Sequence, residues 1–259
     1  MDTVNILAIG DVTGKGGVDI LTRRLRTLQR ELGIAFTVVN GENAAGRGLT
    51  PADAEDIFSA GADVITLGNH AYSKREIADY LDDNRYILRP LNYADAAWGR
   101  GDGVFDAGFG SVRVIALIGR VGMDYNSDNP FKVVSRALEA NPCTFTLIDM
   151  HAEATSEKQA MAYFLDGKVS AVWGTHTHVQ TADARVLPLG TGYITDLGMT
   201  GPYNGVIGMD AEQSIKTFLG IPKDHYRAAS GPCKLEGAVF TLERYSGRCV
   251  NAEAVQIFE

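Results

Sequence analysis

Polar side chains that can bind metal ions follow five short apolar segments of this 259-residue chain. The seven candidate ligands are Asp11, Glu42, Asn43, Asn69, His151, His176 and His178. Imidazole, carboxylate and amide oxygen without thiolate suit manganese, iron, or zinc in a catalytic site. Seven donors exceed what one tetrahedral ion needs, so we expect two ions about 3.5–4 Å apart with one carboxylate bridging them. Such a pair activates water and clamps the oxygens of a phosphoryl group during in-line displacement.

The distribution of histidine strengthens this interpretation. Four of the 5 histidines lie at these segment ends, beside Asp, Glu and Asn residues. The exception is His225, which lies in the loop of residues 222–225. Because a single isolated histidine is usually an ordinary surface or core residue, we expect His225 to have no part in the metal site.

The apolar segments that precede the candidate ligands have the composition of buried β-strands. They are rich in Val, Ile, Leu and Phe without strict polar alternation, and they cover residues 4–9, 35–39, 63–67, 144–148 and 170–173. Loops at the carboxyl ends of strands in an open α/β sheet converge on one crevice, so ligands from distant positions can meet there. Glycine occurs just before four of the ligand sites, which we attribute to tight turns that direct the next side chain into the crevice; these are Gly10, Gly41, Gly68 and Gly174.

Helix signals occur between the predicted strands. Leucines at positions 21, 25, 28 and 32 have helical spacing. Thr50-Pro51 predicts a helix start, and Gly61 lies where the same helix should end. The residues from Ser73 to Glu76 have the pattern of a capping box and predict a helix from residue 73 through 81. Residues 155–165 and 211–219 are further helix candidates.

Two regions interrupt the alternation of strands and helices. Residues 104–117 predict one β-hairpin, and residues 235–242 with 248–257 predict another. No Pro-rich or Ser-rich linker, internal repeat or low-complexity tract divides the chain. We therefore expect one α/β domain over residues 1–259, with a mixed sheet or two stacked sheets flanked by helices.

Composition limits the possible partners and location. The chain is 45% hydrophobic and 22% charged, as expected of a globular protein, and its net charge of -8 argues against a surface that coats nucleic acid or anionic membrane. A small anionic substrate remains compatible, because bound cations can reverse the local field. Three cysteines without a C-x-x-C pair, no secretory signal and no apolar run of about 18 residues favour a cytoplasmic protein.

Two other enzyme classes are excluded by motif spacing. The segment from Gly10 to Gly16 is similar to a phosphate-binding P-loop, but its glycine spacing is one residue short and Gly16 occupies the position where Ser or Thr must hold magnesium. The chain also has no G-x-S-x-G nucleophile elbow. We therefore reject an NTPase and find no support for a serine hydrolase.

Six segments in order closely resemble one known family. The segments GDVTGKGG, NGENAAGRGLT, GADVITLGNHAYSKREI, DMHAEATSEK, GTHTHVQTAD and ITDLGMTGPYNGVIGMD resemble the YmdB-like branch of the calcineurin-like metallophosphoesterases, over about residues 5–210. The resemblance implies a four-layer αββα sandwich of two mixed sheets flanked by helices. It also implies a homo-oligomer that hydrolyses phosphodiesters, with 2′,3′-cyclic nucleotides as the substrate class.

The resemblance also implies a role for each candidate residue. One metal would be held by Asp11, Glu42, Asn43 and His178, and the other by Glu42, Asn69, His151 and His176, with Glu42 bridging. His70 would be the general acid. The usual D-x-H motif of the superfamily is Asp11-Val12-Thr13 here, the usual bridging aspartate is Glu42, and we expect Asn43 to fill the place left at Thr13. The extra oxygen donors favour two manganese or iron ions, with zinc or magnesium as further possibilities.

The expected reaction follows from these roles. A hydroxide bridging the metals would attack phosphorus in line, and His70 would protonate the leaving ribose oxygen, a contribution of about 10²–10⁴ in rate. One alternative is a phosphomonoesterase or 5′-nucleotidase, although no basic cluster is evident among the candidates Lys15, Arg47, Lys74 and Arg75. The other is a regulatory RNA-associated binding protein with secondary hydrolase activity.

Two neighbouring segments have equally balanced interpretations. Glu153, Ser156 and Glu157 are either partners of ligating imidazoles or the acidic start of a capped helix. Residues 200–205 are either a wall of the substrate pocket or a plain turn.

Overall fold

The computed structural model describes residues 2–123, 126–222 and 227–259, and it places the predicted strands in two stacked sheets. His225 lies outside the described residues, so the expectation for it stays a prediction. The apolar segments form strands because each buries side chains on both faces, between the other sheet and a layer of helices.

The first sheet has eight strands in the spatial order β2-β12-β13-β1-β3-β4-β5, with β14 paired to β13. Strands β1, β3, β4 and β5 are parallel, and β13 runs antiparallel to β1. The bounds are β1 (Thr3–Ile9), β2 (Asp11–Val12), β3 (Ile34–Asn40), β4 (Val64–Thr66), β5 (Ile87–Leu88), β12 (Met199–Pro202), β13 (Cys233–Glu243) and β14 (Cys249–Phe258).

The second sheet has six strands in the order β10-β11-β9-β8-β7-β6. Its four central strands are parallel, and β6 and β10 pair antiparallel at the two edges. The bounds are β6 (Asp102–Asp106), β7 (Ser111–Ile118), β8 (Phe145–His151), β9 (Ala171–Thr175), β10 (Arg185–Val186) and β11 (Gly192–Ile194). The predicted hairpins β6–β7 and β13–β14 are both confirmed.

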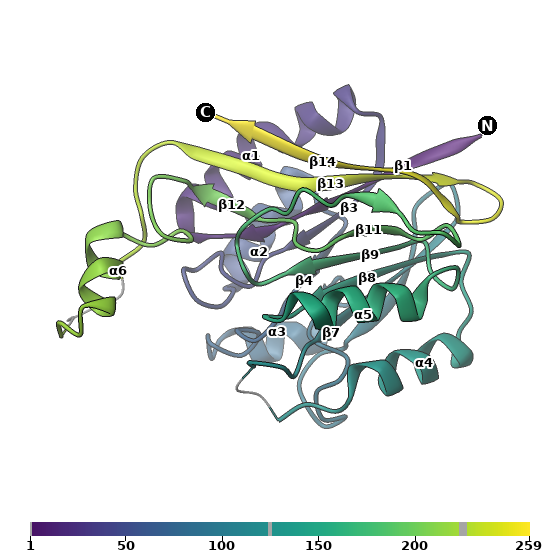
Figure 1. Cartoon of the computed structure of the whole chain (residues 1–259), viewed down its shortest axis with the longest axis horizontal. Helices are drawn as coiled ribbons and strands as arrows, with labels where there is room; N and C mark the ends of the chain where they lie inside the picture. Colours follow the sequence, from purple (N-terminus) through teal and green to yellow (C-terminus); the bar gives the residue numbers. More distant parts are fainter. Residues whose placement is uncertain (1, 124–125, 223–226) are drawn as a thin grey trace.

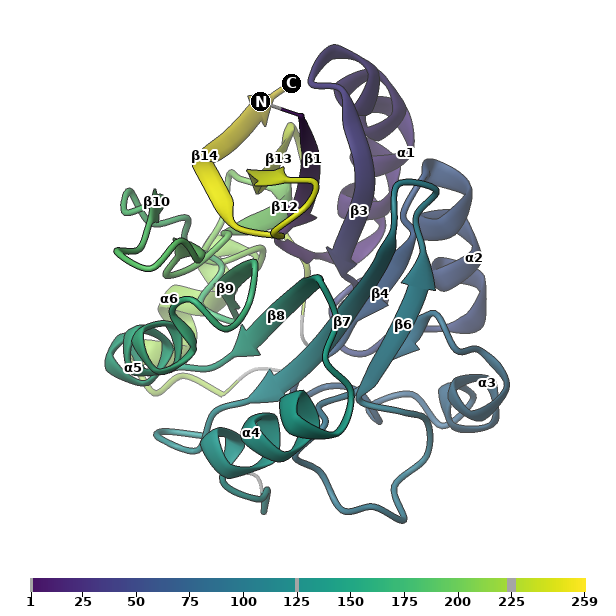
Figure 2. The same ribbon diagram turned by 90° about the vertical axis from the view of Figure 1, so that its right-hand side faces the viewer.

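Helices cover the outer face of each sheet, which confirms the four-layer αββα arrangement (Figures 1 and 2). Helices α1 (Gly14–Glu31), α2 (Pro51–Ala60) and α3 (Ile77–Asp83) bury apolar side chains against the first sheet. Helices α4 (Pro130–Ala140) and α5 (Thr155–Leu165) cover the second sheet. A third apolar cluster lies between the sheets, where Ile6 and Phe36 belong to the same cluster as Trp173.

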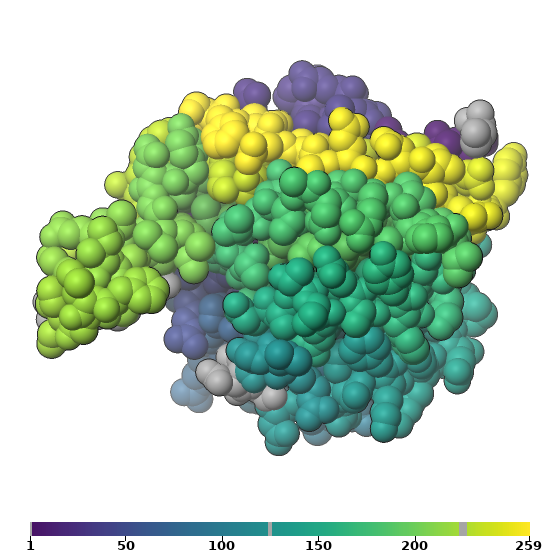
Figure 3. All heavy atoms as spheres, viewed as in Figure 1, coloured from purple at the N-terminus to yellow at the C-terminus, as the bar shows by residue number. Residues whose placement is uncertain are grey.

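Helix α6 (Ala211–Phe218) projects from this body (Figures 1 and 3). It begins at Asp210, whose carboxylate caps the Gln213 N–H, and it has no buried residue. Its side chain Phe218 is 88% exposed. No helix within the described ranges is long and apolar enough to cross a membrane.

Local capping signals predicted one helix well and one poorly. Thr50 Oγ1 accepts from the Asp53 N–H at 3.1 Å and α2 ends at Gly61, as expected. Helix α5, which was not predicted from a cap, has the predicted bounds. The predicted start at Ser73 is wrong, because α3 begins after Glu76 without a side-chain cap. The Ser73 N–H instead bonds His70 O at 3.0 Å, so a turn belonging to the site occupies the residues where the first helical turn would form.

Candidate metal centre

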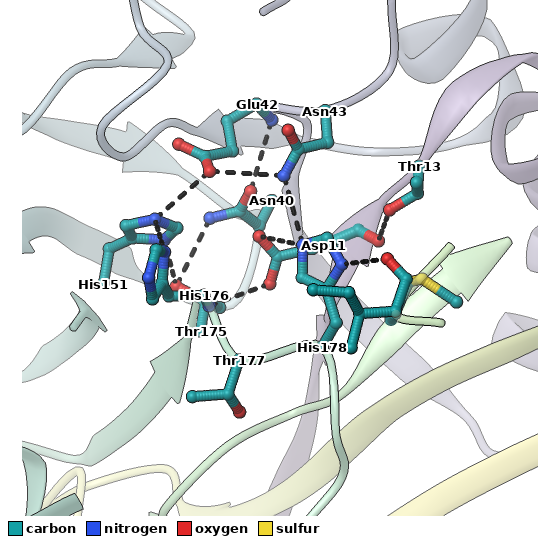
Figure 4. A network of polar contacts seen from close by, with 12 residues as sticks. Asp11, Thr13, Asn40, Glu42, Asn43, His151, Thr175, His176, Thr177 and His178 are labelled. Carbon is teal, nitrogen blue, oxygen red and sulfur yellow. Dashed lines mark hydrogen bonds and ion pairs between the residues drawn. The ribbon is translucent and has the colours of Figure 1, made fainter. Parts of the chain in front are cut away.

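The five predicted ligand segments meet at the carboxyl ends of strands from both sheets. Figure 4 shows the ligands of four of these segments, which are Asp11, Glu42 with Asn43, His151, and His176 with His178. Strands β1, β3 and β4 of the first sheet lead into Asp11, Glu42 and Asn69. In the second sheet, β8 ends on His151 itself, and β9 leads into His176. The parallel direction of these strands brings residues more than 160 positions apart into contact, since the His176 N–H donates to Asp11 Oδ2 at 3.1 Å.

The glycines before the ligands are required by close packing, which corrects the expectation that they form tight turns. None of the four has a φ in the left-handed region. A Cβ on Gly68 would lie 2.2 Å from His151 Cδ2, and a Cβ on Gly174 would lie 1.9 Å from Thr195 O. The left-handed residues are instead His176, with φ 101°, and His178, with φ 63°. Such backbone is costly for a residue with a side chain, so tertiary contacts must hold it.

One cluster of ligand atoms surrounds His151 Nε2. Asn69 Oδ1 lies 2.7 Å from this nitrogen, His176 Nδ1 lies 3.1 Å away and Glu42 Oε1 lies 3.2 Å away. An imidazole nitrogen donates at most one hydrogen, so it cannot satisfy both oxygens with good geometry. Acceptor atoms that converge on one point fit a cation, and the ligand atoms of Glu42, His151 and His176 all lie within 4.8 Å of one another.

A second cluster forms around Asp11, which is fully buried. Its Oδ1 has no hydrogen-bond partner among the described residues and lies 3.7 Å from His178 Nε2. Burial raises the pKa of Asp11, but the attraction of the protonated His178 imidazole nearby outweighs burial and holds the pKa well below its ordinary value. Burial lowers the pKa of His178, and Asp11 more than offsets this and raises it to about 9. An unsatisfied buried oxygen beside an imidazole fits a second cation.

Glu42 lies between the two clusters. Its Oε1 is 3.2 Å from both His151 Nε2 and Asn43 Nδ2, and its Oε2 accepts the His70 N–H at 3.1 Å. Burial raises the pKa of Glu42, but the charge of His151 and a hydrogen bond from it lower the pKa below the ordinary value. The carboxylate therefore has the placement and the charge that a bridging ligand needs.

Asn43 connects the clusters to His70. Its Oδ1 lies 2.9 Å from His70 Nδ1, and its Nδ2 lies 3.2 Å from His178 Nε2. In this orientation the amide nitrogen faces the ligands, so Asn43 stays a prediction as a metal ligand. Burial lowers the pKa of His70, the charge of Glu42 opposes this shift, and the charge of Arg47 adds to it.

A buried set of side chains behind His151 was missed from the sequence. Thr175 Oγ1 lies 2.9 Å from His151 Nδ1 and donates to Asp149 Oδ1 at 2.7 Å. Asp149 also accepts from Thr66 Oγ1 and from Asn40 Nδ2, at 2.5 and 3.2 Å. Because the Thr175 hydroxyl has one proton and gives it to Asp149, His151 Nδ1 must donate, so Nε2 is the nitrogen at which a metal ion would replace a proton. The sequence signal that could have revealed this set is the presence of polar residues, such as Thr66, Asp149 and Thr175, inside strands that are otherwise apolar.

A buried ion pair holds the loop that carries His176 and His178. Lys158 Nζ lies 2.7 Å from Asp196 Oδ2, and both side chains are 1% exposed. The same oxygen accepts from Thr177 N at 3.2 Å and from Thr177 Oγ1 at 2.8 Å. Burial raises the pKa of Asp196, while the Lys158 charge opposes the rise. The pair thereby fixes the backbone between the two left-handed histidines.

The expectations for the segment after His151 are confirmed only in part. Glu153 Oε2 lies 3.1 Å from His176 Nε2, as expected of a partner of a ligating imidazole. Glu157 accepts the backbone N–H groups of Arg120 and Val121 and lies in the first turn of α5, so the alternative of an acidic helix start holds for this residue, although Ala154 provides no side-chain cap. The side chain of Ser156 makes no hydrogen bond within the described ranges.

An open pocket of about 640 Å³ lies over the ligand clusters. It is lined by Thr13, Glu42, Asn43, Gly46, Arg47, His70, Glu153, His176, Thr177, His178, Ile207 and Met209. Residues 200–205 do not line it, and residues 200–202 belong to strand β12, so the segment is neither a wall of this pocket nor a plain turn throughout. Ile207 and Met209 form that side of the pocket. Of the four basic residues suggested by the sequence, Arg47 alone lines the pocket, and its side chain is exposed.

The chain is similar to known proteins over nearly its whole length. A family model described as YmdB-like protein matches residues 7–255. A Bacillus subtilis (strain 168) protein named 2′,3′-cyclic-nucleotide 2′-phosphodiesterase is 42% identical, with 98% of this chain and 97% of that protein covered. The crystal structure of a hypothetical protein from Thermus thermophilus is 38% identical with a TM-score of 0.92, covering 99% of this chain and 100% of that one. The crystal structure of a novel phosphatase from Mycoplasma pneumoniae is 34% identical with a TM-score of 0.93, covering 100% and 95%.

Proposed function

We propose, since the chain belongs to the YmdB-like branch of the calcineurin-like metallophosphoesterases, that it hydrolyses 2′,3′-cyclic nucleotides at the 2′ oxygen with two bound metal ions. The observation that carries the proposal is the pair of ligand clusters joined by Glu42. In one cluster Asp11 Oδ1 is buried without a hydrogen-bond partner among the described residues. In the other, Asn69 Oδ1, His176 Nδ1 and Glu42 Oε1 all converge on the single Nε2 of His151.

The donor types fit two hard or borderline ions. Asp11 and His178 would hold the first ion, Asn69, His151 and His176 the second, and Glu42 would bridge them. When bound, the ions would activate water and neutralise charge on the phosphoryl oxygens. The predominance of imidazole and oxygen donors favours manganese or iron.

His70 supplies the acid in this proposal. It donates Nδ1–H to Asn43 Oδ1 at 2.9 Å, so Nε2 is the nitrogen left to carry and release a proton. The leaving group of a 2′,3′-cyclic diester is the ribose 2′ oxygen, which departs poorly unless it is protonated. The negative charge of a bound diester favours the protonated imidazole and so opposes the effect of burial on His70.

The charge of the pocket favours diesters over monoesters. Arg47 is its one basic side chain other than histidine within the described ranges, and Glu153 adds a negative charge at the rim. A phosphate monoester is a dianion near neutral pH and gains more from additional cations than a diester monoanion does. A 5′-nucleotidase or other monoesterase is therefore the weaker candidate.

Metal analysis and substrate comparison test the proposal together. We expect about two ions per chain by elemental analysis, conversion of 2′,3′-cyclic AMP to 3′-AMP, and faster turnover of bis-p-nitrophenyl phosphate than of p-nitrophenyl phosphate. Asp11→Asn should lose one ion and slow turnover by about 100-fold or more. Asp56→Asn, which changes an exposed aspartate of α2, is the matched control. Zero or one ion per chain, or a monoester preference, would overturn the proposal.

The acid role of His70 has its own test. His70→Gln should slow hydrolysis of 2′,3′-cyclic AMP by about 10²–10⁴-fold while the metal content persists. The loss should be much smaller for bis-p-nitrophenyl phosphate, because p-nitrophenolate departs without a proton. Loss of metal, or an equal loss of rate on both substrates, would remove His70 from the acid role.

A further inference from the structure

A second cavity adjoins the metal centre across Asn69. Its volume is about 380 Å³, and it is lined by Asn69, Tyr72, Ser73, Tyr93, Ala94, Ala97 and Asn126. Asn69 joins the two regions, because its Oδ1 lies 2.7 Å from His151 Nε2 while the same residue forms part of the cavity wall. His70, the next residue, lines the metal pocket. A ligand seated at the metal centre therefore has this cavity directly beside it.

Aromatic rings form the fixed part of this cavity. The rings of Tyr72 and Tyr93 have centroids 6.0 Å apart, and Trp98 packs edge-on against Tyr72, also at 6.0 Å. The Tyr72 hydroxyl donates to Trp98 O at 2.7 Å, and Tyr93 is only 9% exposed within the core cluster of the first sheet. Because packing and a hydrogen bond hold these rings, a ligand that stacks on them has little side-chain entropy to overcome.

The rim of the cavity offers polar groups beside the rings. The side chains of Ser73 and Asn126 are exposed and have no hydrogen-bond partner within residues 2–123, 126–222 and 227–259. A planar apolar face with a hydroxyl and an amide at its edge matches a nucleobase, which has a π face and hydrogen-bonding edges. The metal pocket lacks such a surface, since no Phe, Tyr or Trp is among the described residues that line it.

We infer that the cavity of Tyr72, Tyr93, Ser73 and Asn126 binds the nucleobase of the substrate while the cyclic phosphate lies at the metal centre. The inference rests on the proposed function and specifies how the substrate is recognised. Stacking dominates the contact, so the cavity accepts different bases, and it distinguishes nucleotides from phosphodiesters that have no base.

The test compares each 2′,3′-cyclic nucleotide with methyl β-D-riboside 2′,3′-cyclic phosphate, which has the same reacting group and no base. Tyr72→Leu should raise KM for 2′,3′-cyclic AMP by about 5- to 150-fold with kcat nearly unchanged, the range expected for one base–aromatic stack. The same variant should leave kcat/KM for the abasic diester within about two-fold. Tyr72→Phe, which keeps the ring, should retain the discrimination. Tyr163→Leu, which removes an exposed tyrosine of α5, is the matched control.

The possible results separate the two proposals. If wild-type protein hydrolyses no 2′,3′-cyclic nucleotide, the proposed function fails, and the subsite fails with it. If wild-type protein hydrolyses the nucleotides but Tyr72→Leu affects the nucleotide and the abasic diester equally, only the subsite is refuted. Circular dichroism and the metal content of Tyr72→Leu show whether the fold and the centre are intact. Should this variant misfold, Asn126→Ala at the exposed rim gives the same comparison, and equal effects on both substrates refute the subsite.

Discussion

Replacing Thr175 by valine removes one hydroxyl from the buried contacts behind His151 and keeps a branched side chain of similar size. Thr175 is fully buried, and its hydroxyl joins Asp149 Oδ1 at 2.7 Å to His151 Nδ1 at 2.9 Å. In the variant, the Nδ1–H of His151 and one oxygen of Asp149 lose this partner inside the protein. Both the stability of the fold and the orientation of the His151 ring should suffer.

The magnitude follows from these two groups. Each buried polar group left without a partner costs about 1–3 kcal/mol, so for two groups we expect a loss of about 2–6 kcal/mol in the free energy of unfolding. Removing an outer partner of a ligating histidine typically costs about 10- to 100-fold in metal affinity. The affinity loss should affect the ion proposed to bind His151, Asn69 and His176, and the ion proposed beside Asp11 much less.

The assay is competition for manganese or zinc against a chromophoric chelator, combined with urea unfolding of the metal-free protein. Thr175→Ser is the matched control, because it keeps the hydroxyl and loses only the methyl group. We expect Thr175→Val to bind one of its two ions about 10- to 100-fold more weakly than Thr175→Ser does, as is typical for partners of ligating histidines. If both variants bind metal equally while only stability differs, Thr175 is a structural residue and the hydrogen-bond direction assigned to His151 is wrong.

Three further changes test other parts of the site. Gly68→Ala should displace the His151 ring, because the new Cβ would lie 2.2 Å from Cδ2, and elemental analysis should show less bound metal than in Gly33→Ala. Gly33 has open space around it and a left-handed φ of 58°, so this control includes the backbone strain of an alanine away from the site, and equal metal content in the two variants would contradict the packing explanation. Lys158→Met leaves the buried carboxylate of Asp196 without its cation and should lower the free energy of unfolding by about 3–5 kcal/mol, measured by urea denaturation. A variant as stable as wild type would show that the ion pair does not stabilise the fold. Arg47→Gln should raise KM for an anionic diester by about 2- to 5-fold, as expected of one exposed charge, and the difference should shrink at high salt. Arg75→Gln, which lies outside the pocket, should not change KM, and equal effects of the two variants would show that Arg47 does not bind substrate.

The sequence was sufficient to predict the layers of the fold and the chemical types at the site. Short runs rich in Val, Ile, Leu and Phe without polar alternation favour strands buried on both faces, and each of the five predicted strands overlaps an observed strand. The ligand types could be identified because Asp, Glu, Asn and His at the carboxyl ends of parallel strands must lie near one another. The start of helix α2 could be predicted because its cap is a local contact between Thr50 and Asp53, only three positions apart in the sequence.

Only the tertiary structure decided which atoms meet and what supports them. The left-handed backbone of His176 and His178 has no local sequence signal, because contacts with Lys158 and Asp196 from distant elements maintain it. The capping box predicted at Ser73 does not form for a similar reason. The Ser73 N–H bonds His70 O, within the turn that carries His70 into the site. Local sequence determines preferences of a few tenths to about one kcal/mol per residue, and buried contacts between distant residues outweigh them.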